Sequence, residues 1–370
     1  MFKYFMPTKI FAGENIIKNN SKDIILGKKA MIVTGKTSGE KSGALNDVLE
    51  ILKENSIEYL VFNRIGNNPT LEEVAEGGKV AREFSADFLI GIGGGSPLDA
   101  TKAIAVFAKN EPVPESDFDI YDIFSGTHKS KPLPMAAIPT TAGTGSEATP
   151  YSILTLHKEK NKKSFSHPDI FYKVAFLDGK YLKNIPLQIA RNTMVDTLSH
   201  LIEGYTTKRS TPASDYIALE GLKIIGSLKT KFIEGNFSDQ DRLDLLWAST
   251  LGGMVIAQTG TTIVHAMGYH LTYFKDIAHG MANGLLLTEY LKRVQAVLPK
   301  KFDDILICLE MSIDELKSYL SQILPCATVF SEDEFASWVK VSINAKNVPF
   351  CPFCVTEEEE FKIFRNSLIK

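Results

Sequence analysis

Five polar residues in the second half of the chain have types and spacings that could hold a metal ion. Asp196 and His200 are four residues apart in a segment of helical periodicity, so both side chains leave the same face of the expected helix. His265, His270 and His279 follow downstream. A carboxylate combined with imidazoles is a borderline ligand set that suits Fe²⁺ or Zn²⁺. These residues therefore predict a metal site, and their spacing leaves open which histidines converge.

Two loops rich in glycine and hydroxyl groups each follow an apolar run in the first half of the chain. The first is Gly91-Ile-Gly-Gly-Gly-Ser-Pro-Leu-Asp99, whose successive glycines let a ligand approach the backbone closely. Its amides and the helix start behind it suit a pyrophosphate, although it lacks the standard Rossmann order G-x-G-x-x-G. The second is Pro139-Thr-Thr-Ala-Gly-Thr-Gly-Ser-Glu147. Loops at the carboxyl ends of parallel strands converge, so this pair predicts a nucleotide ligand.

The residues after the first expected strand bear on the choice between NAD(H) and NADP(H). That strand ends at Thr34-Gly35-Lys36. A site that prefers NAD usually offers an acid to the ribose hydroxyls, whereas a 2′-phosphate prefers no acid and a nearby cation. Gly35 lacks the acid and Lys36 supplies a cation, so NADP(H) is favoured. The alternative is that Lys36 only faces solvent.

The elements that must position these groups change character along the chain. Apolar runs at 29–34, 58–62, 87–92 and 134–138 alternate with helical patterns at 43–54, 71–84 and 98–108. Such alternation predicts an α/β domain with a mostly parallel sheet. Shorter strand-like pieces follow within 151–178, including 174–177, and 110–132 is expected to be a polar surface excursion. Later segments show only helical periodicity, at 187–207, 212–234, 240–258, 282–297 and 312–324. We therefore expect a nucleotide-binding domain over 1–181 and an all-helical metal and substrate domain over 182–370.

Composition bounds the class of protein. The chain has 370 residues, a net charge of −3, 44% hydrophobic residues and no apolar run of membrane-spanning length. It predicts neither a nucleic-acid nor a membrane partner, and with no signal-like N-terminus we expect a cytoplasmic protein. Four cysteines are too few for a disulfide framework. We expect Cys351 and Cys354 of the Cys-Pro-Phe-Cys segment, and also Cys308 and Cys326, to be ordinary reduced thiols.

Four segments together resemble the iron-containing (group III) alcohol dehydrogenase family. They are GGGSPLDATKA, PTTAGTGSEATPYS, NTMVDTLSHLIEGY and TTIVHAMGYHLTYFKDIAHGMANGLLL, in the family's order and separation. The resemblance runs from about residue 5 to about residue 300. It implies a dehydroquinate synthase-like fold, with a dinucleotide-binding α/β domain, an all-α metal-binding domain and an active site in the cleft between them.

The resemblance also implies roles for individual residues. The metal ligands, which would take part in catalysis through the ion, would be Asp196, His200, His265 and His279. The pyrophosphate would lie at Gly94, Gly95 and Ser96, near Asp99. Further cofactor contacts would come from Asn68, Thr140, Thr141, Thr149, Ser152, Lys162 and Leu177. Gly35 falls where members that prefer NAD carry an Asp, in agreement with the charge argument.

One position departs from the family pattern. Many members have a histidine four residues after the third metal ligand, whereas here that position is Tyr269 and the histidine is His270. A shift of one residue turns a helical side chain by about 100°. The general acid is therefore open, with water as one candidate and His270 as a weaker one, and Tyr269 is expected to shape the pocket.

The expected activity is a metal-dependent alcohol dehydrogenase or aldehyde reductase acting on small primary alcohols, diols or their aldehydes. It would use Fe²⁺, with Zn²⁺ as the alternative metal, and NADP(H) in preference to NAD(H), and it would form a homodimer. Hydride would pass between the substrate carbon and the nicotinamide, with the metal as a Lewis acid. The alternatives are a glycerol dehydrogenase-like polyol oxidoreductase, a dehydroquinate synthase-like lyase, a metal-dependent hydrolase and a nucleotide sensor. The lyase would need clustered basic residues, which 185–300 lacks.

Overall fold

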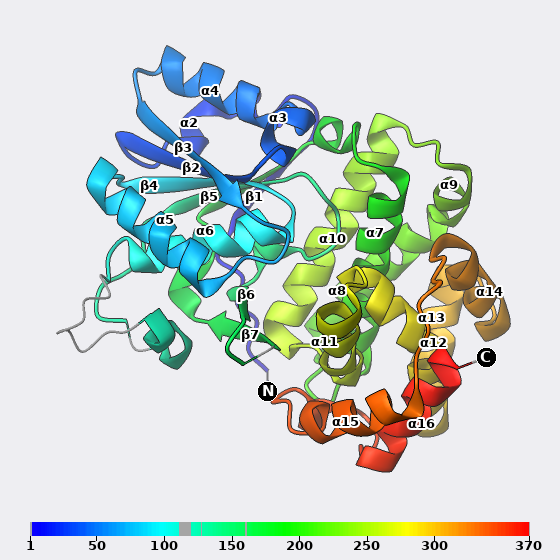
Figure 1. Cartoon of the computed structure of the whole chain (residues 1–370). Coiled ribbons are helices and arrows are strands. Elements are labelled where there is room, and N and C mark those ends of the chain that lie inside the picture. The colour runs from blue at the N-terminus through cyan, green and yellow to red at the C-terminus, as the bar shows by residue number, and fades with distance from the viewer. Residues whose placement is uncertain (1, 111–119, 127, 160, 370) are drawn as a thin grey trace. The chain divides into compact units, whose positions relative to one another are not determined.

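The computed structural model describes residues 2–110, 120–126, 128–159 and 161–369 (Figure 1). The chain forms two compact units. One comprises Met6–Ile185 and Ser238–Thr250, and the other comprises Met1–Phe5, Pro186–Phe237 and Leu251–Lys370. The boundary expected near residue 181 stays a prediction.

The first unit is built on a six-stranded parallel sheet, as the alternating pattern predicts. The strand order is β1 (Lys9–Ala12), β8 (Val174–Leu177), β5 (Met135–Pro139), β4 (Phe88–Gly93), β2 (Lys29–Gly35) and β3 (Glu58–Ile65). The chain leaves β2 for β3 on one side and returns to β4 on the other. This reversal creates a topological switch point between β2 and β4, where open α/β sheets bind ligands.

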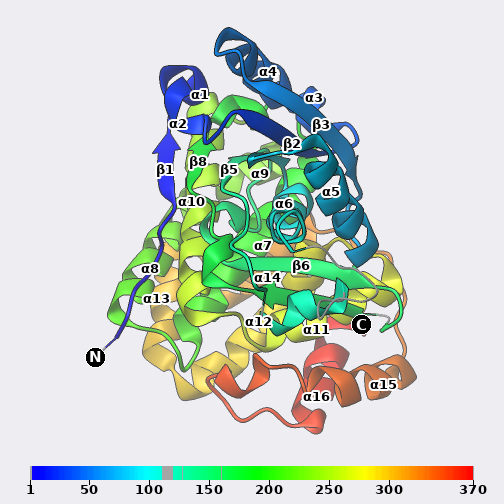
Figure 2. The same cartoon turned by 90° about the vertical axis from the view of Figure 1, so that its left-hand side faces the viewer.

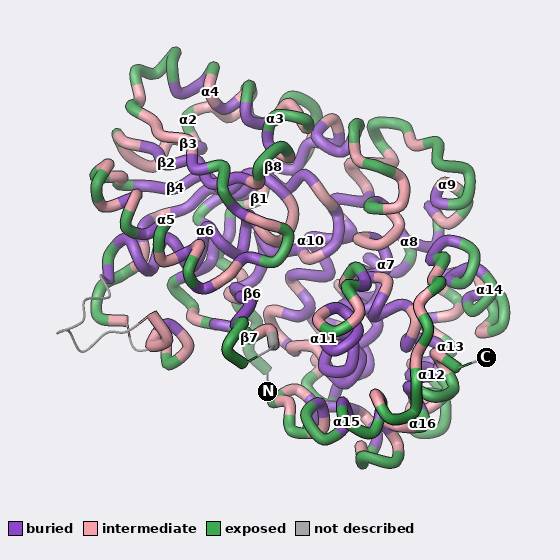
Figure 3. The backbone as a smooth tube through the Cα atoms, in the orientation of Figure 1, coloured by how far each residue is buried: buried purple, intermediate pink, exposed green. Residues whose placement is uncertain are grey.

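Helices cover both faces of this sheet, and side-chain alternation explains why. Met31 and Val33 of β2 pack into the core under α5 (Leu71–Phe84) and α6 (Gly95–Phe107). Ala30 and Ile32 pack into the opposite core, under α4 (Ala44–Glu54). Figure 1 shows α4 on one side of the strands and α5 and α6 on the other, and Figure 3 shows the central strands buried. The short helices α1 (Ile16–Asn19), α2 (Ser21–Ile24) and α3 (Ser38–Ser42) complete this part.

Two expectations differ from the structure: one strand is not predicted from the sequence, and part of the predicted surface excursion is buried. β1 is short and only partly buried, and it pairs with β8 at the sheet edge (Figure 2). The strand expected to be first is therefore β2. Within the predicted excursion at 110–132, residues 111–119 and 127 lie outside the described residues. The 3₁₀ helix η1 (Ile120–Ser125) contributes the fully buried Ile123 to the core, so this part is not all surface.

A hairpin and short helical turns link β5 to β8. β6 (Tyr151–Leu156) and β7 (Asn161–Ser166) pair antiparallel, and η2 (Ser146–Ala148) precedes them. The 3₁₀ helices η3 (Pro168–Ile170) and η4 (Gly179–Leu182) stand before and after β8. The strand-like pieces expected within 151–178 are therefore a hairpin and one sheet strand.

The second unit is helical, as the periodicity predicts. Its helices are α7 (Leu187–Thr206), α8 (Pro212–Ser227), α9 (Lys229–Glu234), α11 (Ile263–Lys275), α12 (His279–Val297), α13 (Pro299–Leu309), α14 (Ile313–Ile323), α15 (Glu332–Ser342) and α16 (Glu357–Leu368), with η5 (Val348–Phe350). α10 (Asp239–Thr259) contributes its first half to the α/β unit, where Thr250 Oγ1 donates to Glu147 Oε1 at 2.7 Å. The predicted fold class, a parallel α/β part followed by an all-α part, is confirmed.

Two composition-based expectations can be compared with the structure. All four cysteines are free, and burial raises the pKa of Cys351 to about 12, which leaves its thiol unreactive at neutral pH. Among the described residues, no helix has the length and apolarity needed to span a bilayer.

Candidate metal centre and nucleotide-binding edge

Three helices of the helical unit carry the predicted metal ligands. Asp196 and His200 lie on α7, His265 lies on α11, and His279 begins α12. α12 packs against both α7 and α11. Gly280 makes this approach possible, because a Cβ there would clash with the carbonyl of Asn192 and lie 3.0 Å from the amide nitrogen of Asp196.

The ligand atoms of Asp196, His265 and His279 lie within 4.8 Å of one another, and His200 lies beside this group, stacked on His265. The Oδ1 atom of Asp196 lies 4.0 Å from Nε2 of His200 and 3.7 Å from Nε2 of both His265 and His279. Atoms bound tetrahedrally to one ion at about 2.1 Å stand about 3.4 Å apart, so small side-chain shifts suffice for coordination. Asp196, His200 and His265 are buried, and His279 keeps a quarter of its side chain exposed. The structure thus brings all four together.

An amide hydrogen-bond donor marks where a cation would lie. The Nδ2 group of Asn283 is 3.1 Å from Asp196 Oδ1, 3.3 Å from His265 Nε2 and 3.4 Å from His279 Nε2. One carboxylate and neighbouring imidazoles are ligand types that divalent cations such as Fe²⁺ or Zn²⁺ bind, so these residues fit a divalent cation. Asn283 is four residues after His279 on α12, a spacing that could have indicated it in the sequence.

A buried carboxylate behind His265 orients its ring. Glu203 on α7 is fully buried, and its Oε2 contacts Nδ1 of His265. Its Oε1 accepts the backbone N–H groups of Thr262 and Val264, at 2.8 and 3.0 Å, and the Thr262 hydroxyl at 2.6 Å. A carboxylate that binds the remote nitrogen of a histidine turns the other nitrogen toward a metal. Sequence reasoning missed Glu203, although it lies three residues after His200 in the same helix.

Burial and neighbouring charges shift the pKa values of Asp196 and His265 in opposite directions. Burial favours a higher pKa for Asp196, but the neighbouring histidines outweigh burial and lower it, so the carboxylate is ionised. Burial likewise acts to lower the pKa of His265, but Glu203 and Asp196 outweigh it and raise the pKa to about 9. The pocket therefore has a negative potential that attracts a cation.

The side chains of Tyr269 and His270 contact different groups. The ring of Tyr269 stacks on His279, with centroids 5.2 Å apart. His270 stacks with Phe274 and Trp338 instead, at centroid distances of 6.1 and 6.2 Å, and burial lowers its pKa to about 4. Its neutral ring therefore contributes to an aromatic layer, and its geometry does not favour the proton-relay role.

The predicted cofactor loops lie at one edge of the sheet in the α/β unit. Gly93 and Pro139, which end β4 and β5, are paired in register, and the amide of Thr140 donates to the Gly93 carbonyl at 2.9 Å. A Cβ at Gly94 would lie 2.7 Å from the hydroxyl of Thr141, so the two loops touch here and a larger residue would have to displace the Thr141 side chain. Within the described residues no side chain caps the start of α6 at Gly95 and Ser96, whose amides can therefore bind an anion.

Three residues that the resemblance assigns to the cofactor belong to a buried network. Asp99 accepts from the Ser146 hydroxyl at 2.5 Å and from the Ile153 amide at 2.9 Å. The hydroxyl of Ser152 donates to the Asp99 carbonyl at 2.7 Å, which ties β6 to α6. The third residue is Thr149, whose hydroxyl oxygen accepts a hydrogen bond from a buried lysine.

That lysine is Lys102 on α6, which sequence reasoning missed. Its ammonium donates to Ser146 Oγ at 2.8 Å, Thr149 Oγ1 at 3.1 Å and the Tyr151 carbonyl at 2.6 Å. Burial lowers its pKa to about 8, partly offset by Asp99 and Glu147. Lys102 and Asp99 together fasten the second loop to the helix that follows the first.

The other predicted cofactor residues occupy three places. Gly35 ends β2 and Lys36 follows it in an exposed turn. Asn68 and Lys162 are joined by a hydrogen bond of 2.8 Å. Leu177 ends β8 and is fully buried. Gly35 thus lies beside the switch point, whereas Leu177 can present only its backbone or a small part of its side chain.

Comparisons with known proteins agree with these two parts. Residues 7–179 match the family described as iron-containing alcohol dehydrogenase, and residues 190–323 match its C-terminal domain. The chain is 31% identical to the NADPH-dependent butanol dehydrogenase of Clostridium saccharobutylicum over 79% of its length and 74% of that protein. It is 32% identical to the lactaldehyde reductase of Escherichia coli K12 over 75% of its length and 71% of that protein.

A solved structure is similar to this chain over its whole length. An iron-containing alcohol dehydrogenase from Thermotoga maritima is 39% identical, with a TM-score of 0.91, and the match covers 100% of this chain and 99% of that one. The family matches span most of the chain, and both relatives exceed 30% identity over more than two thirds of it. The chain therefore belongs to the iron-containing alcohol dehydrogenase family, whose members are oxidoreductases.

Proposed function

We propose that this protein reduces short aldehydes, and oxidises the corresponding primary alcohols or diols, with NADP(H) in preference to NAD(H). The observation that carries the proposal is the grouping of ligand atoms from Asp196, His265 and His279, with Nε2 of His200 4.0 Å from Asp196 Oδ1. We propose Asp196, His200, His265 and His279 as the ligands of Fe²⁺, with Zn²⁺ as the alternative. The bound ion supplies Lewis acidity toward the substrate oxygen, and the nicotinamide supplies or accepts the hydride.

The residues of the chain hold these groups in place. Asp196 is ionised and contributes negative charge to the ion, and Glu203 keeps Nδ1 of His265 engaged so that Nε2 faces the ligand set. Tyr269 covers one face of His279 and limits the space beside it. We assign no general acid among the described side chains, and water is the proposed proton source.

The proposed cofactor contacts lie along the sheet edge. Gly94, Gly95 and Ser96 would bind the pyrophosphate through backbone amides, and Thr140 and Thr141 would face it from the second loop. Asp99, Thr149 and Ser152 would act by positioning that loop, and Asn68, Lys162 and Leu177 stay predicted contacts. Gly35 leaves room for a 2′-phosphate, and the exposed Lys36 offers it a cation.

Similar proteins named for their activities support the proposed substrate range. The similar proteins include a butanol dehydrogenase, a 1,3-propanediol dehydrogenase from Klebsiella pneumoniae and a lactaldehyde reductase. All act on small alcohols, diols or aldehydes, and we propose the same chemical class here. The homodimer and the cytoplasmic location stay predictions.

The test is anaerobic turnover with defined metals. The purified protein would be stripped of metal, reloaded with Fe²⁺ or Zn²⁺, and assayed by NADPH or NADH absorbance with a series of short aldehydes. We expect metal-dependent oxidation of NADPH, faster than that of NADH. Turnover with NADH alone would overturn the cofactor preference, and turnover in a metal-free His265→Ala variant would overturn the metal site.

A further inference from the structure

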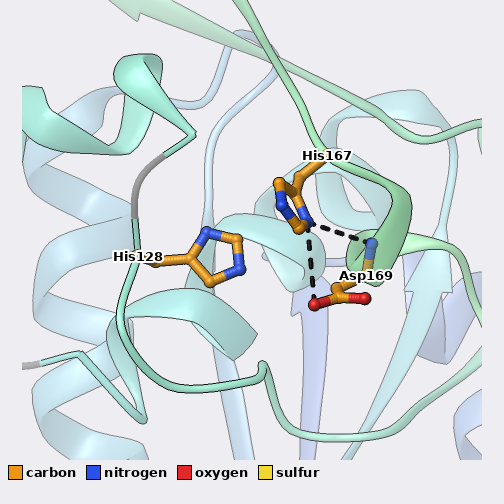
Figure 4. A group of neighbouring side chains, drawn as sticks. All are labelled: His128, His167 and Asp169. Carbon is orange, nitrogen blue, oxygen red and sulfur yellow. Dashed lines mark hydrogen bonds and ion pairs between the residues drawn. The ribbon is translucent and has the colours of Figure 1, made fainter.

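A second group of potential metal ligands lies in the α/β unit. His128 belongs to the segment between η1 and β5, and His167 and Asp169 lie at the start of η3. Each offers one ligand atom, and these three atoms lie within 4.8 Å of one another. Figure 4 shows the His128 ring turned toward His167 and Asp169. The group shares no residue with the Asp196 cluster.

His167 contacts Asp169 in two ways through one ring nitrogen. Its Nδ1 accepts the backbone N–H of Asp169 at 3.1 Å, so this nitrogen is unprotonated in the neutral ring. The Asp169 carboxylate oxygen Oδ2 lies 3.8 Å from the same nitrogen. This spacing is close to the distance of about 3.4 Å between two ligands of one zinc ion, and a bound ion would replace the amide N–H as the partner of this nitrogen.

His128 completes the set from a distant part of the chain. Its ring meets that of His167 edge to face, with centroids 4.3 Å apart, and it also packs against the buried Phe165. Its Nδ1 is buried and has no hydrogen-bond partner among the described residues. Such unsatisfied nitrogens are uncommon in folded proteins, and a ligand that accepts their lone pair removes the cost.

We propose that His128, His167 and Asp169 form a second metal site that takes a borderline divalent ion, with Zn²⁺ the best match. Two imidazoles and one carboxylate are suitable ligands for Zn²⁺, and the partial exposure of His167 and Asp169 lets water complete the coordination. The ion ties the segment before β5 to η3. Since only the folded chain brings the three side chains together, binding stabilises the fold.

Metal stoichiometry tests the site. The holoprotein would be loaded with Zn²⁺, freed of excess metal and analysed by atomic emission, alongside His128→Ala, Asp169→Asn and the control His157→Ala, which removes an exposed histidine of the same unit. We expect the parent protein and His157→Ala to hold one more equivalent of zinc than His128→Ala or Asp169→Asn. Equal zinc in all four proteins would overturn the proposal.

Two further measurements separate this site from the Asp196 cluster and from misfolding. His265→Ala should lose the zinc equivalent bound at the Asp196 cluster and keep the one bound by His128, His167 and Asp169. Loss of metal from one site can therefore be told apart from loss of metal from the other. Added Zn²⁺ should raise the melting temperature of metal-stripped His265→Ala, but not that of the double variant His265→Ala/Asp169→Asn. The side chain of Asp169 is partly exposed, so its replacement by Asn should leave the fold intact. Equal rises in both proteins would also overturn the proposal.

Discussion

Replacing Glu203 by Gln should weaken the metal site by reversing the tautomer of His265. Three donors hold Glu203 Oε1, namely the amides of Thr262 and Val264 and the Thr262 hydroxyl. A Gln side chain would keep its oxygen there, because the opposite orientation would turn an NH₂ group toward those donors. Its amide nitrogen would then face Nδ1 of His265 and donate to it. The ring proton would move to Nε2, the nitrogen that faces Asp196, where it blocks metal binding.

The size of the effect follows from the role of such partners. Loss of a carboxylate that orients a metal-bound histidine typically costs about 10- to 100-fold in metal affinity, equivalent to about 1.4 to 2.7 kcal/mol. Glu203→Ala is a poorer test, because it would leave three buried donors without an acceptor at about 1 to 3 kcal/mol each. The Gln variant keeps those bonds and should fold.

The assay is a competitive Zn²⁺ titration of the metal-stripped protein against a chelating dye, followed by turnover at saturating metal. Glu220→Gln, an exposed site on α8 of the same unit, is the matched control and should bind as the parent does. We expect Glu203→Gln to bind at least about tenfold more weakly, with part of its activity restored by excess metal. Unchanged affinity in a folded Glu203→Gln would refute the tautomer argument.

Three further predictions concern other parts of the chain. Gly35→Asp should shift the cofactor preference toward NADH by on the order of tenfold, because a carboxylate about 4 Å from a phosphate costs about 1 kcal/mol or more. The side chain of Ser38 must rotate to admit the new Cβ. Gly35→Ala adds the Cβ alone and should not change the ratio of NADPH to NADH activity. Lys102→Met should raise the KM for NADPH roughly tenfold without loss of bound metal, since its hydrogen bonds to Ser146 in the second loop and to Thr149 and Tyr151 just after it disappear. An unchanged KM would remove its positioning role. Burial raises the pKa of Glu360 from 4.5 to about 7, so the folded chain holds this proton more tightly than the unfolded chain. This contribution to the free energy of unfolding is full below about pH 4.5 and is lost as the pH rises toward 7, a fall of at most about 3 kcal/mol. Urea unfolding at pH 5 and pH 8 should show this fall in the parent protein and not in Glu360→Gln.

Periodicity in the sequence was sufficient to predict most elements of the fold. Buried strands such as β2 and β4 are continuous apolar runs, and the helices have one apolar stripe, because each pattern reflects which faces meet the core. β1 escaped notice because it is four residues long and half-exposed at the sheet edge. The periodicity of α10 predicts a helix but does not specify its partner, and its first half belongs to the α/β unit.

The metal site shows the same division at the level of single residues. Residue types and a family resemblance pointed to Asp196, His200, His265 and His279 before any geometry was known. Only the tertiary structure placed Glu203 behind His265 and Asn283 among the ligand atoms, because these contacts join separate helices.

The same reason applies to the network of Lys102 and to the group of His128, His167 and Asp169. Nothing in the local sequence distinguishes a buried lysine from an exposed one, or a histidine with a distant partner from one in solvent. Local patterns report which side of an element is apolar, and this information is present within a few residues. Which polar groups meet depends on how elements distant in sequence pack, and that is decided only when the chain is folded.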